Sequence, residues 1–194
     1  MFKNNSNIIS LSEDIFLYKD FISKDEASAL HKKCIEYSDG IWNSIKNPIA
    51  WYNGKTSCNV EEAKELFKKV NDLVFETHTP TPSYSFVRMF TGDSMHEHTD
   101  TCGDEEATAN DDFDTCAITD YGVVIYLNDD FEGGEIYYTD LGIEYKPSAG
   151  DLIIHNARIS HEVKEVISGT RYCYPTFLIK NVLKDSIRKI NDKH

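Results

Sequence analysis

The stretch YGVVIYLNDDFEGGEIYYTD, Tyr121 to Asp140, contains two apolar runs rich in β-branched and aromatic residues, separated by Gly133-Gly134. Such residues favour strands, and paired glycines favour a turn between them. Six further runs of this kind occur between residues 83 and 180: SYSFVRMF, SMHEHTD, IEYKP, DLIIHN, EVKEVI and TRYCYPTFLIK. Many short strands within about 100 residues are typical of a sandwich or barrel.

Two helices are predicted ahead of these strands. A Ser-x-x-Glu capping box begins at Ser23 and predicts a helix over Lys24–Tyr37, with apolar residues at helical spacing. Asn59 with Glu62 predicts the start of a second helix, which should end near Glu76. Helices followed by strands indicate an α+β domain in which the helices pack on one outer face of the sheet.

The composition excludes several classes of protein. Hydrophobic residues make up 40% of the 194 residues and aromatic residues 12%, which is typical of a globular domain. A formal net charge of −13 repels phosphate backbones, so we expect no nucleic-acid partner. No apolar stretch reaches the ~18 residues of a membrane span, and no signal peptide is recognisable. The predicted location is therefore cytoplasmic, without a membrane partner.

The five cysteines form no CxxC motif, and their number is odd. This pattern indicates free thiols in a reducing compartment. Cys102 and Cys116 flank one loop, so a pair between them stays open.

The segment GDSMHEHTD, Gly92 to Asp100, places His96, His98 and Asp100 at alternate positions. On a strand, these three side chains would share a face. His161 starts another strand-like run about sixty residues later. Two imidazoles and one carboxylate can form the facial triad of non-heme Fe(II) enzymes. The spacing alone leaves open which of the three residues in this segment bind metal.

Four further motifs follow a fixed order along the chain. Gly92 precedes His98 by six residues, and a strand with a Gly-Gly-Glu turn follows in VVIYLNDDFEGGEIYY. A Pro-x-x-Gly turn leads into an apolar strand in KPSAGDLIIHN, and Arg171 lies ten residues after His161. In this order, residues from about Tyr84 to Phe177 resemble the 2-oxoglutarate- and Fe(II)-dependent dioxygenases, specifically the prolyl 4-hydroxylase-like group.

The resemblance implies a role for individual residues. It assigns His98, Asp100 and His161 as metal ligands and leaves His96 as a neighbouring pocket residue. Arg171 would bind 2-oxoglutarate, because a planar guanidinium can hold a carboxylate by two hydrogen bonds. Tyr126 resembles a family tyrosine that hydrogen-bonds the same carboxylate, although a core role is equally compatible, and Thr170 is a weaker candidate.

The resemblance also implies a fold and an organisation. The expected fold is a double-stranded β-helix, or jelly roll, with N-terminal helices packed on one face. We expect a single dioxygenase domain over residues 1–194. Residues 1–82 would form a mainly helical support, residues 83–180 the catalytic core and residues 181–194 a C-terminal tail.

The implied reaction is hydroxylation of a C–H bond with Fe(II), 2-oxoglutarate and O2, releasing succinate and CO2, with ascorbate as a further cofactor. Proline in a peptide or protein is the leading substrate, and a free amino acid or other small molecule stays open. Ile136 and Phe177 stand where the family often has Thr and Trp, so the resemblance does not extend to one named substrate.

Two other functions are compatible with the same barrel. A non-catalytic, cupin-like binding module would lack a cosubstrate anchor, and Arg171 argues against it. A zinc hydrolase could use the same two histidines and one aspartate, but the chain shows no zincin-type glutamate motif.

The segment TCGDEEATANDDFDTCAITD, Thr101 to Asp120, follows the His-x-Asp directly and is strongly acidic. A segment this polar cannot join the core. Long loops beside a site are often lids. We therefore weigh two interpretations of residues 101–117, a lid that favours a basic or neutral peptide and an acidic surface loop.

Overall fold

The computed structural model describes residues 7–37, 42–44, 52–53, 56–59, 61–73, 77–81, 85–101 and 119–181. Most of the acidic segment, including Cys102 and Cys116, and residues 182–194 of the predicted tail lie outside these ranges. The interpretations given above for the loop and for the cysteine pair therefore stay predictions.

The larger sheet contains nine antiparallel strands. Its main path has the order β1-β2-β13-β9-β16-β7-β5-β3, and β6 pairs with β16 outside this path. In chain order the strands are β1 (Ile8–Ser10), β2 (Ile15–Tyr18), β3 (Asn43–Ser44), β5 (Thr56–Asn59), β6 (His78–Pro80), β7 (Ser85–Phe90), β9 (Thr119–Tyr126), β13 (Leu152–Asn156) and β16 (Thr170–Lys180). The strands before residue 83 lengthen the sheet at both edges, which the sequence did not predict because runs of two to four residues show no clear period.

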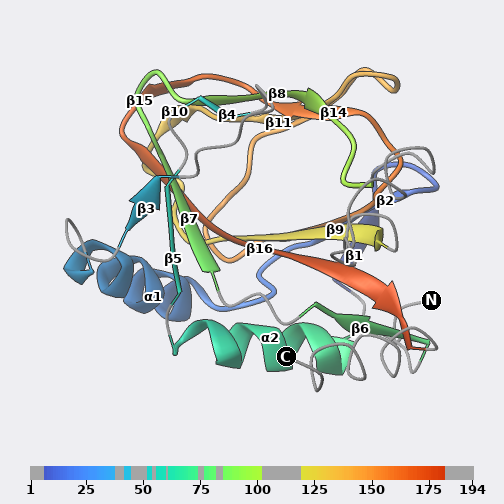
Figure 1. Ribbon diagram of the computed structural model, residues 1–194, viewed down its shortest axis with the longest axis horizontal. Coiled ribbons are helices and arrows are strands. Elements are labelled where there is room, and N and C mark those ends of the chain that lie inside the picture. The colour runs from blue at the N-terminus through green and yellow to red at the C-terminus, as the bar shows by residue number, and fades with distance from the viewer. Residues whose placement is uncertain are drawn as a thin grey trace, which may run out of the picture.

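A second sheet faces the first across the interior (Figure 1). It has five antiparallel strands in the order β12-β11-β14-β8-β4. Its members are β4 (Tyr52–Asn53), β8 (Ser94–His98), β11 (Ile136–Tyr138), β12 (Ile143–Tyr145) and β14 (His161–Val163). A small sheet pairs β10 (Glu132–Gly133) with β15 (Val166–Ser168). The two facing antiparallel sheets are the predicted double-stranded β-helix.

Two helices, α1 (Lys24–Glu36) and α2 (Ala63–Leu73), cover the outer face of the larger sheet (Figure 1). Their buried residues join one hydrophobic cluster with residues of the sheet, among them Phe86 and Leu178. This confirms the prediction that the helices pack on one face. Neither described helix has the length and apolar character that a membrane crossing requires.

Side chains alternate between the two faces of the larger sheet. In β9, Ile125 joins the cluster under the helices, whereas its neighbour Tyr126 joins a separate cluster between the sheets. In β16, Tyr174 points towards the helices and Cys173 towards the interior. Because side chains alternate along a strand, every second residue of β9 and β16 is available to line the space between the sheets.

The second helix begins later than the sequence predicts. Asn59 is not its N-cap, because Asn59 ends β5 and pairs with Ser85 of β7. The amide of Lys64 donates to the carbonyl of Glu61, so a turn leads into the helix at Ala63. Strand pairing therefore overrides the local capping signal, and residues 74–76 at the predicted end lie outside the described ranges.

The first helix has the predicted capping box. The Ser23 hydroxyl accepts a hydrogen bond from the Glu26 amide at 3.2 Å, and the Glu26 carboxylate accepts one from the Ser23 amide at 2.9 Å. We expect Ser23→Ala to lower the free energy of unfolding by about 1 kcal/mol, measured by urea denaturation. Ser28→Ala, at an exposed position inside the same helix, is the control and should be neutral or slightly stabilising. Equal losses in both variants would contradict the capping role.

Candidate active site

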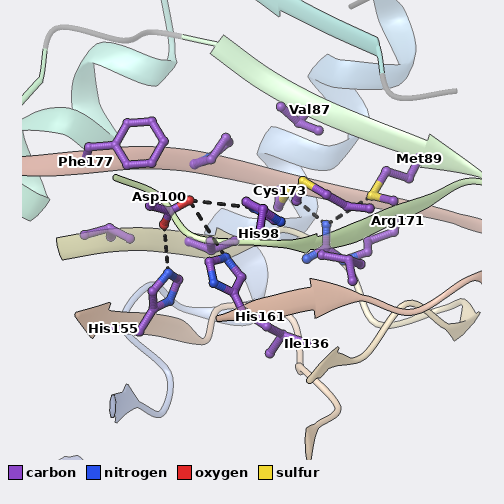
Figure 2. A pocket seen from close by; sticks show the side chains of 15 residues that line it. Val87, Met89, His98, Asp100, Ile136, His155, His161, Arg171, Cys173 and Phe177 are labelled. Atoms are coloured by element: carbon purple, nitrogen blue, oxygen red, sulfur yellow. Dashed lines mark hydrogen bonds and ion pairs between the residues drawn. The ribbon is translucent and has the colours of Figure 1, made fainter. Parts of the chain in front are cut away.

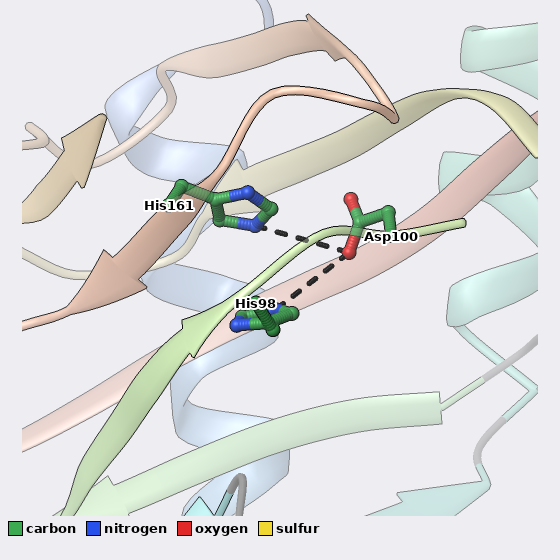
Figure 3. Close-up of side chains that lie close together, drawn as sticks. All are labelled: His98, Asp100 and His161. Atoms are coloured by element: carbon green, nitrogen blue, oxygen red, sulfur yellow. Dashed lines mark ion pairs between the residues drawn. The ribbon is translucent and has the colours of Figure 1, made fainter. Parts of the chain in front are cut away.

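Three predicted metal ligands come together between the sheets. His98 ends β8, Asp100 follows two residues later, and His161 begins β14 directly opposite His98. The Nε2 atoms of His98 and His161 lie 3.7 and 3.8 Å from Oδ1 of Asp100. One ligand atom from each residue lies within 4.8 Å of the others, and the three side chains converge in Figure 3. This spacing suits one bound metal ion.

Both imidazoles present their Nε2 atoms to the common centre. Nδ1 of His98 lies 2.8 Å from the carbonyl oxygen of His96, and Nδ1 of His161 lies 2.9 Å from that of Ile159. A carbonyl can only accept a hydrogen bond, so each Nδ1 carries the proton. Each Nε2 is then left with a lone pair, which is the form of histidine that binds a metal.

The electrostatics of the cluster keep its donors in ligand form. Burial acts to raise the pKa of Asp100, but the hydrogen bond from His155 and the nearby imidazoles outweigh it and lower the pKa to about 2. Burial, with the neighbouring His155, lowers the pKa of His161 to about 3. At neutral pH the cluster therefore offers an ionised carboxylate and a neutral imidazole.

A β-bulge decides which residues of β8 face the interior. Met95 pairs with Val163 and His98 with His161, so β8 has one more residue than β14 between these pairs. The extra residue interrupts the alternation of side chains. Met95 and His98 both line the cavity, whereas His96 is exposed and does not. The prediction that His96 shares the face of His98 is therefore wrong.

The three residues line one cavity between the two sheets. Most of its wall is apolar (Figure 2). The lining residues are Val87, Met89, Met95, His98, Asp100, Val123, Val124, Ile136, His155, His161, Val163, Arg171, Cys173, Pro175 and Phe177. The three predicted metal ligands and Arg171 thus share one chamber.

Arg171 is a buried cation in this cavity. Its side chain is on β16 and only 3% exposed. Nη1 donates to Sδ of Met89 at 3.6 Å and to Sγ of Cys173 at 3.3 Å (Figure 2). Burial opposes its charge, but Cys173 and Tyr126 more than offset this and raise its pKa. Thioether and thiol sulfurs are weak acceptors, and Nε has no partner among the described residues, so the guanidinium can still bind an anion.

The cavity lining does not include the two other residues predicted to bind the cosubstrate, Tyr126 and Thr170. Tyr126 is fully buried, and its ring lies 5.1 Å from the guanidinium carbon of Arg171. Thr170 neighbours Arg171 on β16, so its side chain points to the other face of the sheet. The Thr170 carbonyl accepts a hydrogen bond from the side-chain Nδ2 of Asn128 at 2.7 Å. The structure thus places Tyr126 against Arg171 and does not bring the Thr170 side chain to the site.

Sequence reasoning missed the residues that surround Asp100. His155 is 1% exposed, and its Nε2 lies 2.8 Å from Oδ2 of Asp100. Its Nδ1 lies 3.1 Å from the hydroxyl of Tyr138. Its apolar surroundings in DLIIHN gave no indication of a carboxylate that lies 55 residues away in the chain.

Gly122 of β9 makes room for this hydrogen bond. A Cβ there would lie 2.0 Å from Oδ2 of Asp100 and 2.5 Å from Nε2 of His155. We therefore expect Gly122→Ala to push the two side chains apart and to weaken metal binding at least about 10-fold, as the loss of an outer hydrogen-bond partner does. Calorimetric titration with Mn(II) would measure this, with thermal unfolding as the check on folding. Unchanged affinity in a folded variant would contradict the tight packing of Asp100 against Gly122.

The donor set fits Fe(II). Two imidazoles and one carboxylate on one side of a metal leave further coordination positions open, as in the non-heme Fe(II) oxygenases. Zinc accepts the same ligands. The buried Arg171 favours the Fe(II) case, because a dicarboxylate that chelates the metal at one end needs a cation at its other end.

Residues 84–178 match the model of the 2OG-Fe(II) oxygenase superfamily. Among curated proteins, a putative prolyl 4-hydroxylase of Acanthamoeba polyphaga mimivirus is 25% identical over 122 residues. This match covers 63% of the present chain and 45% of the viral protein. The chain thus spans less than half the length of this curated relative.

Solved structures share the fold at low identity. A Pseudomonas putida prolyl-4-hydroxylase aligns with a TM-score of 0.65 and 18% identity, covering 87% of this chain and 93% of that one. A prolyl hydroxylase of Trichoplax adhaerens, in complex with a hypoxia inducible factor peptide fragment, aligns with a TM-score of 0.61 and 14% identity, covering 88% and 86%. The viral collagen prolyl hydroxylase of Paramecium bursaria Chlorella virus-1, in a 2OG complex, aligns with a TM-score of 0.58 and 17% identity, covering 86% and 96%. These likenesses support the double-stranded β-helix.

Proposed function

Through residues 84–178 the chain belongs to the 2OG-Fe(II) oxygenase superfamily, and from this membership we propose that it is a 2-oxoglutarate-dependent Fe(II) dioxygenase that hydroxylates a C–H bond. The observation that carries the proposal is that three metal-ligand side chains and the buried Arg171 line one apolar cavity.

Each group of the site would have a defined task. Nε2 of His98, Nε2 of His161 and Oδ1 of Asp100 would hold Fe(II). When bound, the metal supplies, together with 2-oxoglutarate and O2, the oxidising power for hydroxylation, and succinate and CO2 are the expected coproducts. The apolar walls would lower the local dielectric constant, which strengthens charge interactions inside the chamber.

Arg171 would bind the carboxylate of 2-oxoglutarate that lies away from the metal. Its planar guanidinium can form two parallel hydrogen bonds with a carboxylate. The weak sulfur contacts to Met89 and Cys173 hold the side chain in place without neutralising its charge. Tyr126, buried against the guanidinium, remains a candidate to support the same interaction.

We propose a prolyl residue in a peptide or protein as the substrate. The support is that the curated relative and the three similar structures above are named as prolyl hydroxylases, one of them in complex with a peptide fragment. A free amino acid or another small molecule is the second candidate, and ascorbate is an expected additional cofactor.

The competing functions predict a different site. A non-catalytic binding module has no use for a buried cation that makes no ion pair with any described residue. A zinc hydrolase would retain activity with Zn(II) and without 2-oxoglutarate. Arg171 therefore favours the dioxygenase over both.

The test is Fe(II)-dependent release of succinate from 2-oxoglutarate against a library of proline-containing peptides, with ascorbate present. We expect coupled turnover with at least one peptide and the gain of one oxygen atom on its proline by mass spectrometry. Matched peptides with alanine in place of that proline should give only uncoupled background. Succinate release with free proline alone would favour the small-molecule alternative, and none under any condition would contradict a dioxygenase.

A further inference from the structure

A chain of hydrogen bonds runs from the second sheet to the carboxylate of the metal site. It links Tyr138 on β11, His155 on β13 and Asp100 after β8, at 3.1 Å and 2.8 Å. Tyr138 and His155 are almost completely buried, at 0% and 1% exposure. A buried polar chain of this kind persists when its members satisfy one another.

The direction of each hydrogen bond follows from the chemistry of the groups. An ionised carboxylate can only accept, so Nε2–H of His155 donates to Asp100. In the tautomer with its proton on Nε2, the imidazole has a lone pair on Nδ1, which accepts a hydrogen bond from the Tyr138 hydroxyl. Burial raises the pKa of Tyr138 well above its ordinary value, which keeps this donor protonated. The tyrosine thus fixes the tautomer of the imidazole that contacts Asp100.

The two oxygens of Asp100 have different surroundings. Oδ2 is held by His155 at 2.8 Å, whereas Oδ1 lies towards the Nε2 atoms of His98 and His161 at 3.7 and 3.8 Å. The backbone of Asp100 is also held, because its amide donates to the carbonyl of Ala157 at 2.9 Å. The carboxylate is therefore fixed at both ends of its side chain before any metal arrives.

We propose that His155, locked by Tyr138, is a positioning residue that occupies Oδ2 of Asp100 and so leaves Oδ1 alone to bind the metal. This rests on the proposed function. Binding through one oxygen keeps a coordination position open for the cosubstrate and O2. An unrestrained carboxylate could rotate and bind through both oxygens.

A merely structural histidine is the rival interpretation. In that case substitution of His155 would lower the free energy of unfolding and leave the metal affinity unchanged. An apolar side chain of similar size could then replace the imidazole without loss of metal binding. The metal affinity of variants that keep or remove the donor to Oδ2 separates these two roles.

The experiment is anaerobic calorimetric titration of the apo protein with Mn(II), with thermal unfolding of each variant. His155→Leu removes the donor, and His155→Gln keeps an amide N–H that can reach the same oxygen. We expect His155→Leu to lose about 10- to 100-fold in Mn(II) affinity, the range for outer partners of metal ligands, and His155→Gln to recover most of it. Tyr138→Phe should lose several-fold.

Tyr137→Phe is the matched control for Tyr138→Phe. Tyr137 is the preceding residue on β11 and faces away, with the Lys164 ammonium 4.8 Å from its ring centroid. Its variant should bind Mn(II) as the wild type does.

The outcomes separate this inference from the proposed function. Equal Mn(II) affinity in wild type, His155→Leu and His155→Gln would overturn the positioning role while the metal site stands. Absence of Mn(II) and Fe(II) binding in the wild type would instead contradict the proposed function. If His155→Leu does not fold, equal affinity of wild type, His155→Gln and Tyr138→Phe would still count against the inference.

Discussion

Alanine at His98, Asp100 or His161 should abolish tight Fe(II) binding and, with it, 2-oxoglutarate turnover. Each residue contributes one of three ligand atoms that lie within 4.8 Å of one another. Loss of an outer partner already costs about 10- to 100-fold in metal affinity, so loss of a ligand should cost more than about 100-fold. Anaerobic titration with Fe(II), followed by succinate release, measures both effects.

The control is His96→Ala, two residues away on the same strand. Because the bulge leaves His96 exposed and outside the cavity, this variant should bind Fe(II) normally. If His96→Ala loses the metal while His98→Ala keeps it, the assignment of ligands is displaced by two residues.

Arg171→Ala should raise the KM for 2-oxoglutarate far more than it changes metal affinity. A charge-assisted pair inside the barrel should contribute about 2–4 kcal/mol, which corresponds to roughly 30- to 1000-fold. The guanidinium is 3% exposed and its sulfur contacts at 3.3 and 3.6 Å are weak acceptors, so a bound carboxylate would be its strongest partner. Steady-state kinetics at saturating Fe(II) gives the KM, and Mn(II) titration gives the metal affinity.

Arg171→Lys should recover part of the loss, because the charge survives and the planar fork does not. An unchanged KM for 2-oxoglutarate in Arg171→Ala would mean that another residue binds the cosubstrate carboxylate. It would also favour the interpretation as a non-catalytic binding module. A loss of metal affinity equal to the rise in KM would instead indicate a general collapse of the cavity.

Much of the fold was predictable because its signals are local. The first helix begins with a capping box that the structure contains, and the predicted strands between residues 83 and 180 form because β-branched and aromatic runs are separated by turns. The late start of the second helix was not predictable, because Asn59 pairs with Ser85 across the sheet, a contact that no local pattern contains.

The candidate site likewise has residues that sequence patterns predict and residues that they do not. The proximity of His98, Asp100, His161 and Arg171 was foreseen from ordered motifs. The position of His96 was not, because an extra residue in β8 becomes evident only beside its partner strand. Gly122 and His155 were also missed. Gly122 matters because a side chain there would clash with Asp100 and His155. His155 matters because it contacts Asp100, which lies 55 residues away in the chain.

The bulge in β8 bears on any attempt to transplant this centre into another protein. In a regular strand, the side chains of Met95 and His98 would project to opposite faces of the sheet, since the two residues are three positions apart. Here both reach the same chamber. A designer who copies only the ligand side chains onto an ideal scaffold would therefore lose either the first imidazole or the wall beside it. The bulged backbone of β8 would have to be transferred together with the three predicted ligand side chains.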